Sequence, residues 1–76
     1  MIKQVYEISV NWGNNNLDGY DFEMYDTLED AMEVFKDASH PDKAVTQIIL
    51  NQSKYDIHDG EFDLLDQSEV AVKENN

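Results

Sequence analysis

The chain has 76 residues, 17 of them acidic against 5 lysines and no arginine, which gives a net charge of −12. This charge argues against direct binding to nucleic acid or to an anionic membrane, because both repel an acidic surface. So small a domain has little core to spare for a substrate pocket, so we expect no enzyme and no cofactor. With 41% hydrophobic residues, the chain still carries enough apolar surface to fold, unlike a disordered acidic tail.

Cysteine is absent, so disulfides and thiolate chemistry are excluded. The N-terminus alternates in hydropathy and lacks the unbroken apolar run of a signal peptide. No stretch approaches the length of a transmembrane helix. We therefore expect a cytoplasmic protein.

The first part of the chain predicts a β-hairpin. Apolar residues alternate with polar ones over 2–12, which is typical of a strand. Residues 13–19 are rich in Gly and Asn, which tolerate the positive φ angles of a tight loop. Residues 20–25 alternate again and predict a second strand that pairs with the first.

A helix is predicted from Thr27 to about Ser39. Thr27 is a suitable N-cap, and acidic residues follow in the first turn, where the helix dipole favours them. Pro41 then disfavours helical geometry at His40. The apolar stripe of this helix consists of Leu28, Ala31, Met32, Phe35 and Ala38.

The last part of the chain predicts two more strands. Residues 44–50 are β-branched and apolar on both faces, as in a central strand. Residues 51–57 either continue this strand through a kink or form a loop, up to an Asp-Gly turn at 58–60. A final strand covers 61–65, and residues 68–76 are expected to fray as a tail.

The order ββαββ predicts one α+β domain over residues 1–76. We expect a four-stranded antiparallel sheet in the order 2-1-3-4, with the helix packed on one face. The expected core joins the helix to Tyr6, Ile8, Val10, Phe22, Met24, Ile48, Leu50, Phe62 and Leu64. The uncovered face would show Lys3, Val5, Glu7, Asp21, Glu23, Tyr25, Gln47, Ile49, Glu61, Asp63 and Leu65.

Two segments have the composition of metal sites. Asn14, Asn16, Asp18 and Gly19 match the opening of a calcium loop, but Tyr25 occupies the closing position where a bidentate Glu belongs. A hairpin loop explains them better. Residues 56–61 hold four potential ligands, including His58, yet alternate side chains of a hairpin diverge. We therefore predict no metal at either place.

Acidic residues recur in three parts of the predicted fold: the second strand, the helix and the last hairpin. Such clusters could imitate the phosphates of nucleic acid and occupy a basic groove on another protein, with opposite charge speeding the encounter. Tyr25, at a strand end, could anchor such an interface. The predicted partner-binding residues are Asp18, Asp21, Glu23, Tyr25, Glu29, Asp30, Glu33, Asp37, Asp56, Asp59, Glu61 and Asp63.

Four features of the chain are informative together: its small size, its charge of −12, its lack of Cys and Arg, and the segment from Asp21 to Phe35. With these features the chain resembles a class of acidic phage and mobile-element proteins. These are anti-CRISPR and antirestriction proteins of the DNA-mimic type. The resemblance implies a non-enzymatic inhibitor whose partner is a basic DNA- or RNA-binding protein, such as a CRISPR effector nuclease.

Two alternatives stay open. One is a small protein-interaction or regulatory module, either monomeric or homodimeric, whose acidity serves only solubility. It is suggested by apolar residues on the uncovered face and by edge strands that could pair with another chain. The other is a metal-dependent enzyme built around His58.

Overall fold

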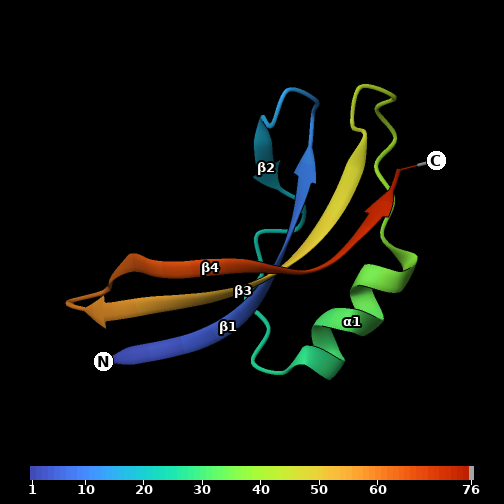
Figure 1. The fold of residues 1–76 in the computed structure, drawn as a ribbon. Coiled ribbons are helices and arrows are strands. Elements are labelled where there is room, and N and C mark those ends of the chain that lie inside the picture. The colour runs from blue at the N-terminus through green and yellow to red at the C-terminus, as the bar shows by residue number, and fades with distance from the viewer. Residues whose placement is uncertain (76) are drawn as a thin grey trace.

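Four strands and one helix make up the fold of the computed structural model, which describes residues 1–75 (Figure 1). The sheet is antiparallel throughout, its order is β2-β1-β3-β4, and α1 packs on one face. The α+β fold and the strand order predicted from the sequence are therefore confirmed. No helix in the described part of the chain is long and apolar enough to span a membrane. The elements are β1 (Ile2–Asn11), β2 (Leu17–Gly19), α1 (Leu28–Asp37), β3 (Gln47–His58) and β4 (Glu61–Glu74).

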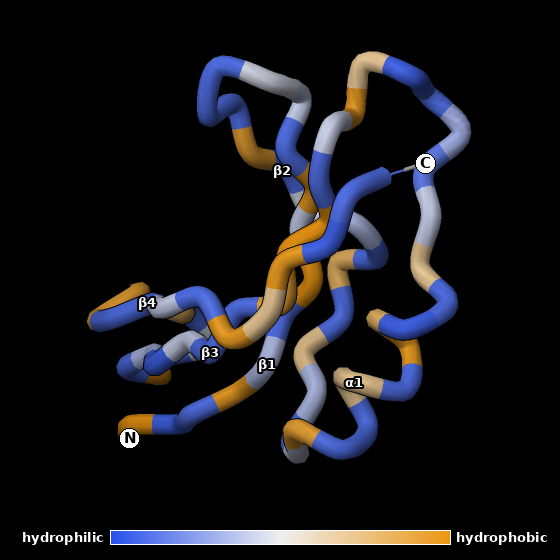
Figure 2. Tube along the Cα trace, turned by 45° about the vertical axis from the view of Figure 1, so that its right-hand side comes forward, coloured by the Kyte–Doolittle hydropathy of each residue, from blue (hydrophilic) through white to orange (hydrophobic). Residues whose placement is uncertain are grey.

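The core lies where β1 and β3 pass beneath α1. Ile8 of β1 pairs with Leu50 of β3, and Val10 pairs with Ile48, so the four side chains form one apolar patch on the helix side. Figure 2 shows hydrophobic positions gathered at this crossing. The buried cluster is completed by Ala31, Phe35, Ala38 and Val45.

The second strand lies earlier than predicted, at Leu17–Gly19 instead of residues 20–25. The loop turns back quickly because Asn14 and Asn15 both adopt positive φ, so Gly19 already pairs with Ser9. Phe22 then has a φ of 59°, which interrupts an extended chain, and its side chain is 85% exposed. Phe22 and Met24 were therefore wrongly predicted to lie in the core.

The helix begins where the sequence predicts. The Thr27 hydroxyl accepts a hydrogen bond from the backbone N–H of Asp30 at 3.2 Å, which caps the first turn. Ala31 and Phe35 are buried against the sheet, as the stripe predicts. The helix ends at Asp37, two residues early, and Leu28 is 40% exposed at the flank instead of in the core.

β3 runs unbroken from Gln47 to His58, so residues 51–57 are strand and not loop. β4 is also longer than predicted. It continues to Glu74, so the predicted fraying is wrong for residues 68–74, which pair with β3. The side-chain N–H₂ of Asn75 then donates to the carbonyls of His40 and Val45 at 3.1 and 3.0 Å, fixing the end of the strand. Residue 76 lies outside the described residues.

Two bulges change which face β4 presents. The register shifts at Leu50/Asn51 and at Lys54/Tyr55, so β4 holds one extra residue at each point. Before the bulges, the Asp59-Gly60 turn sets the register: it pairs His58 with Glu61, so Phe62 and Leu64 lie opposite Ile57 and Tyr55, on the face away from α1. They are 49% and 53% exposed, and the prediction that they join the core is wrong. Glu61 and Asp63 lie on the opposite face from the one predicted.

The face of the sheet opposite α1, here the helix-free face, is not a row of exposed carboxylates. Val5, Ile49 and Ser53 on this face are at most 3% exposed. Polar side chains bond across it: Asn51 to Ser9 at 2.9 Å, Gln67 to Ser53 at 3.0 Å, and Tyr55 to Glu7 at 2.5 Å. The prediction of a mostly acidic, uncovered face is therefore wrong near the middle of the sheet.

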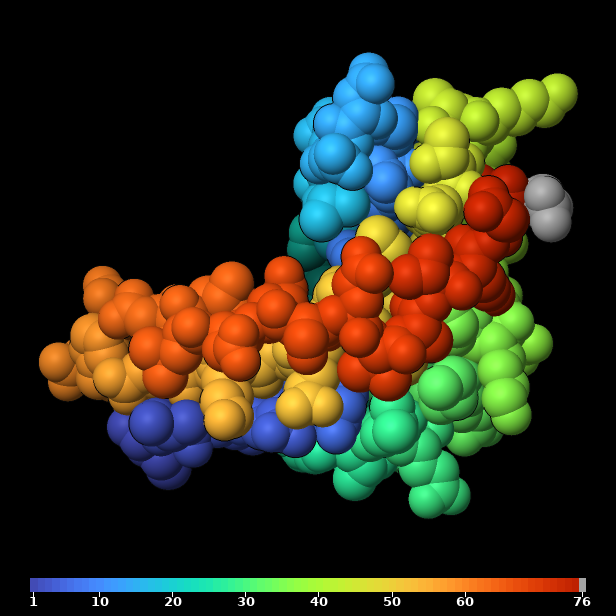
Figure 3. Space-filling view, in the orientation of Figure 1, coloured from blue at the N-terminus to red at the C-terminus, as the bar shows by residue number. Residues whose placement is uncertain are grey.

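The β3–β4 hairpin and the start of β1 project from the body as an arm, defined here as residues 2–5 and 54–66. Figure 3 shows the resulting L-shaped outline, with the arm on the left. The radius of gyration is 12.7 Å, against about 11.4 Å for a compact chain of this length. The arm thus leaves strand edges and side chains free of the helix.

Candidate functional site

A groove lies between α1 and the segment that follows β2. We call it the acidic groove. Three carboxylates line its helix wall, and two tyrosines line the other. Its lining residues are Tyr20, Tyr25, Asp30, Glu33, Val34, Asp37 and Ala38.

The helix wall follows from the periodicity of α1. Asp30, Glu33 and Asp37 are spaced by three and four residues, so their side chains share one stripe of the helix. Ala31 and Phe35 turn toward the sheet and fix the rotation of the helix about its axis. The same pattern that buries the apolar stripe therefore directs these carboxylates into the groove.

The tyrosine wall is held by the edge of β1. Tyr25 and Tyr6 exchange two backbone hydrogen bonds of 2.8 Å, forming an isolated bridge. The backbone N–H of Tyr20 donates to Ile8 at 3.0 Å. The Tyr20 hydroxyl lies 3.3 and 3.4 Å from the carbonyl oxygen and the amide nitrogen of Ser39, just past the helix. Both rings are thus positioned before any partner binds.

Acidic neighbours determine the state of Tyr25. Its hydroxyl donates a hydrogen bond to the carboxylate of Asp21. This bond, together with burial and the negative charges of Asp21 and Glu23, raises the pKa of Tyr25 far above its ordinary value. The tyrosine therefore remains a neutral donor. Asp21 and Glu23 do not line the groove, and they act on it only through their effect on Tyr25.

The carboxylates of the acidic groove are not neutralised within the described residues. The ion pairs there join Lys3 to Asp26, the N-terminal amine to Asp56, and His58 to Asp63. None of these pairs includes a residue of the groove. The groove therefore presents its negative charge to solvent.

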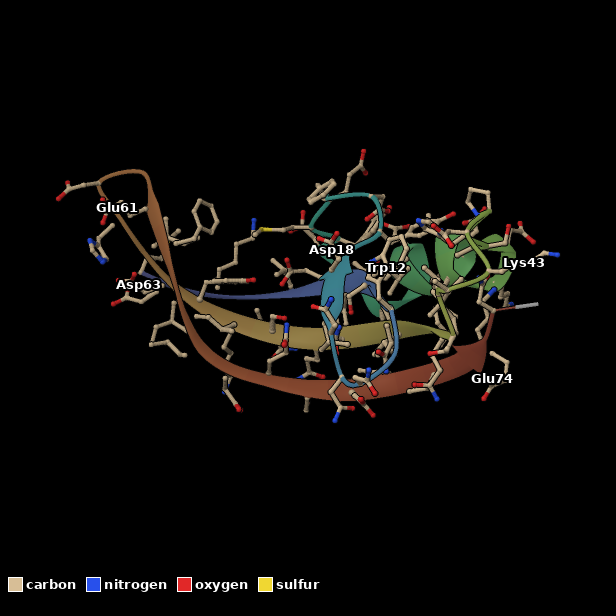
Figure 4. The ribbon with its side chains drawn as sticks, turned by 90° about the horizontal axis from the view of Figure 1, so that it is seen from above. Trp12, Asp18, Lys43, Glu61, Asp63 and Glu74 are labelled. Atoms are coloured by element: carbon tan, nitrogen blue, oxygen red, sulfur yellow. The ribbon has the colours of Figure 1, made fainter. Side chains whose placement is uncertain are left out.

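The structure separates the other predicted residues from the groove. Asp18 lies on β2, where its carboxylate accepts from the N–H of Gly19 at 2.9 Å. Glu29 lines a different surface of α1, beside Met32 and Lys36. Figure 4 shows Glu61 and Asp63 at the tip of the arm, at the other end of the molecule from Lys43. Asp56 and Asp59 belong to the same hairpin, so the twelve predicted residues do not form one surface.

The arm tip does not assemble a metal site. His58 Nε2 lies 2.6 Å from Asp63 Oδ2, and Asp56 pairs with the N-terminal amine at 3.1 Å. Within residues 1–75, no three His, Asp or Glu side chains come close enough to hold a metal ion. The side chains at the tip pair with one another or extend into solvent.

Two aromatic residues outside the predicted site pack against the edge of the core. Trp12 packs edge-on against His40, with the ring centroids 5.1 Å apart. Tyr20 packs against the core and also lines the groove. The sequence holds no signal for Tyr20, because its contact with Ser39 joins positions 19 residues apart.

Comparison with known proteins identifies no relative of this chain. No family model, no curated protein and no solved structure matches it. The acidic groove, the arm and the charge of the chain are therefore the features on which its function has to be argued.

Proposed function

We propose that this chain is a non-enzymatic inhibitor that binds a basic, nucleic-acid-binding surface of another protein by imitating the charge of DNA. The expected target is a CRISPR-type or restriction-type defence nuclease. The observation that carries the proposal is the row of unneutralised carboxylates along α1, facing two ordered tyrosines. The resemblance to small acidic anti-defence proteins supports the choice of target.

Charge density shows why the row matters more than the total. Seventeen carboxylates over 5,156 Å² give one per about 300 Å², whereas B-DNA carries one phosphate per roughly 110 Å² for a cylinder of about 10 Å radius. Along α1, Asp30, Glu33 and Asp37 follow at rises of about 4.5 and 6 Å. One DNA strand places a phosphate every 3.4 Å. The stripe therefore comes within about twofold of the phosphate spacing along one DNA strand.

The groove suits the side chains that normally hold phosphates. An arginine or lysine entering it would meet carboxylates on one wall and tyrosine rings on the other, which attract cations by charge and by the ring faces. Each side chain held this way is withheld from DNA. Inhibition follows from competition and needs no chemical step.

The first experiment is capture of partners from a bacterial lysate on the immobilised protein. Recovery of a nuclease that elutes as salt is raised, and that added DNA displaces, would support the proposal. Recovery only of partners that DNA does not displace would contradict it.

Matched variants then test the groove itself. Asp30→Asn, Glu33→Gln and Asp37→Asn together remove three charges from α1. Asp59→Asn, Glu69→Gln and Glu74→Gln remove the same number at exposed positions outside the groove and serve as the control. Both variants lose the same net charge, so long-range attraction to a basic partner weakens equally in both. A larger loss of inhibition in the groove variant would therefore show that the groove carboxylates contact the partner directly. Equal inhibition by the wild-type protein and both variants would exclude the mimic.

A second candidate function rests on the arm. Ile2, Phe62, Leu64 and Leu65 are 49–66% exposed there, which suits a protein-interaction module whose acidity serves solubility. Such a module would form complexes that do not dissociate as salt is raised and that added DNA does not displace. The same capture experiment therefore separates the two functions.

A further inference from the structure

The outer edge of β4 is a long strand edge without a neighbour. β4 is last in the sheet order and bonds to β3 along its other edge. Within the described residues, its outer N–H and C=O groups face no strand. Over Glu61–Val70 every residue is exposed. An edge of this kind can pair with an added strand.

The part of β4 in the arm has two chemically different faces. Phe62 and Leu64 project to the helix-free face, where the Phe62 ring packs edge-on against Tyr55 at 5.9 Å between centroids. Glu61 and Asp63 project to the opposite face. A strand added here would meet an apolar row on one face and carboxylates on the other. It would need the same alternation, apolar residues on one face and basic residues on the other.

Charge argues against a second copy of this chain as the occupant. β4 carries five carboxylates and one basic side chain, Lys73. Pairing β4 with itself would bring these carboxylates close to one another across the two strands, and like charges that face each other directly are destabilising.

We propose that the Glu61–Asp66 edge of β4 binds an extended segment of a partner protein, in which lysine or arginine alternates with apolar residues. Main-chain hydrogen bonds add the segment to the sheet. Its basic side chains face Glu61 and Asp63, and its apolar ones face Phe62 and Leu64. This site lies on the arm and does not rest on the acidic groove.

The test uses the wild-type protein with four blocked eight-residue peptides, followed by NMR of the backbone amides. The first peptide alternates Lys and Val. The second peptide has the same composition in the order Lys-Lys-Val-Val. The third has the sequence of the first, with alternate backbone amides N-methylated. The fourth has the sequence of the first with Glu in place of each Lys. Only the first should shift the amides of β4 and β3 in the arm. The others should bind at least about tenfold more weakly, because they lose alternation, main-chain bonds or opposite charge.

Three outcomes would overturn the proposal. Equal binding of the alternating and block peptides would mean that net charge alone attracts them. Shifts confined to α1 would place the peptide in the acidic groove. A dimer in sedimentation at 0.15 M salt, with β4 amides shifted on dilution, would make the second copy the occupant. Each result leaves the DNA-competition experiment on the groove variants unaffected, so the two proposals fail separately.

Discussion

Tyr55, on the helix-free face, makes the stability of the protein depend on pH in the alkaline range. Burial, and next the hydrogen bond to Glu7, raise the pKa of Tyr55 to about 12 from an ordinary value near 10. The unfolded chain loses this proton first, so the stabilisation is complete below pH 10 and is lost as the pH rises from 10 to 12. The expected loss is about 3 kcal/mol at most.

Urea denaturation between pH 9 and 11.5 checks this prediction. Tyr55→Phe removes the ionisable hydroxyl, so its free energy of unfolding should fall less over this interval than that of the wild-type protein. Lysine ionisation affects both proteins alike. Parallel curves for the two proteins would contradict the linkage.

Asn75 holds the end of β4 to the loop after α1. Its side chain accepts from the N–H of His40 at 3.0 Å and donates to the carbonyls of His40 and Val45. Asn75→Ala leaves these half-buried groups without partners and should cost about 1–3 kcal/mol. Thermal unfolding should show a fall of at least about 4 °C in Tm. Asn16→Ala, at an exposed loop position, is the control and should leave Tm unchanged.

The N-cap of α1 determines how well the acidic groove is presented. Thr27→Ala removes the acceptor for the N–H of Asp30 and should destabilise the protein by about 1 kcal/mol. Thr27→Ser keeps the hydroxyl and should restore most of that loss in denaturant titrations. A destabilised serine variant would show that the threonine methyl, and not the cap, matters.

At the scale of elements, the sequence predicted features that depend on neighbouring residues better than features that depend on which distant segments pair. The helix stripe, the first strand and the Asp59-Gly60 turn were all visible in the sequence, and both turn residues have the positive φ that such a turn requires. The carboxylate row of the groove also follows from helical spacing. The tyrosine wall does not, because it depends on where the chain returns to the edge of β1.

The faces of β4 beyond Leu64 could not be predicted for a different reason. Alternation assigns a face only while the register holds, and each bulge inserts one residue that reverses the assignment. Leu65 and Val70 occupy these points, and nothing in their local sequence marks a bulge. The length of β4 was missed because polar residues along an exposed edge look like a tail.

Considered as a whole, the molecule should become more stable as salt is added. Its longest dimension is 38 Å, and the screening length falls from about 30 Å at 0.01 M salt to about 8 Å at 0.15 M. At low salt the carboxylates therefore repel one another across most of the protein, which disfavours the compact state. We expect Tm to rise by a few degrees over this range in calorimetry. The variant with three neutralised groove carboxylates should show a smaller rise.

The position of β1 in the sheet also determines when the protein can fold. β1 is translated first, yet its main partner is β3, and the pairs run from Asn11 with Gln47 to Ile2 with Asp56. At about 5–20 residues per second, the first strand waits several seconds for its partner to be synthesised. Such distant pairings also slow folding itself. The sheet therefore assembles only once nearly the whole chain has been made, and until then the apolar side of β1 is open to chaperones.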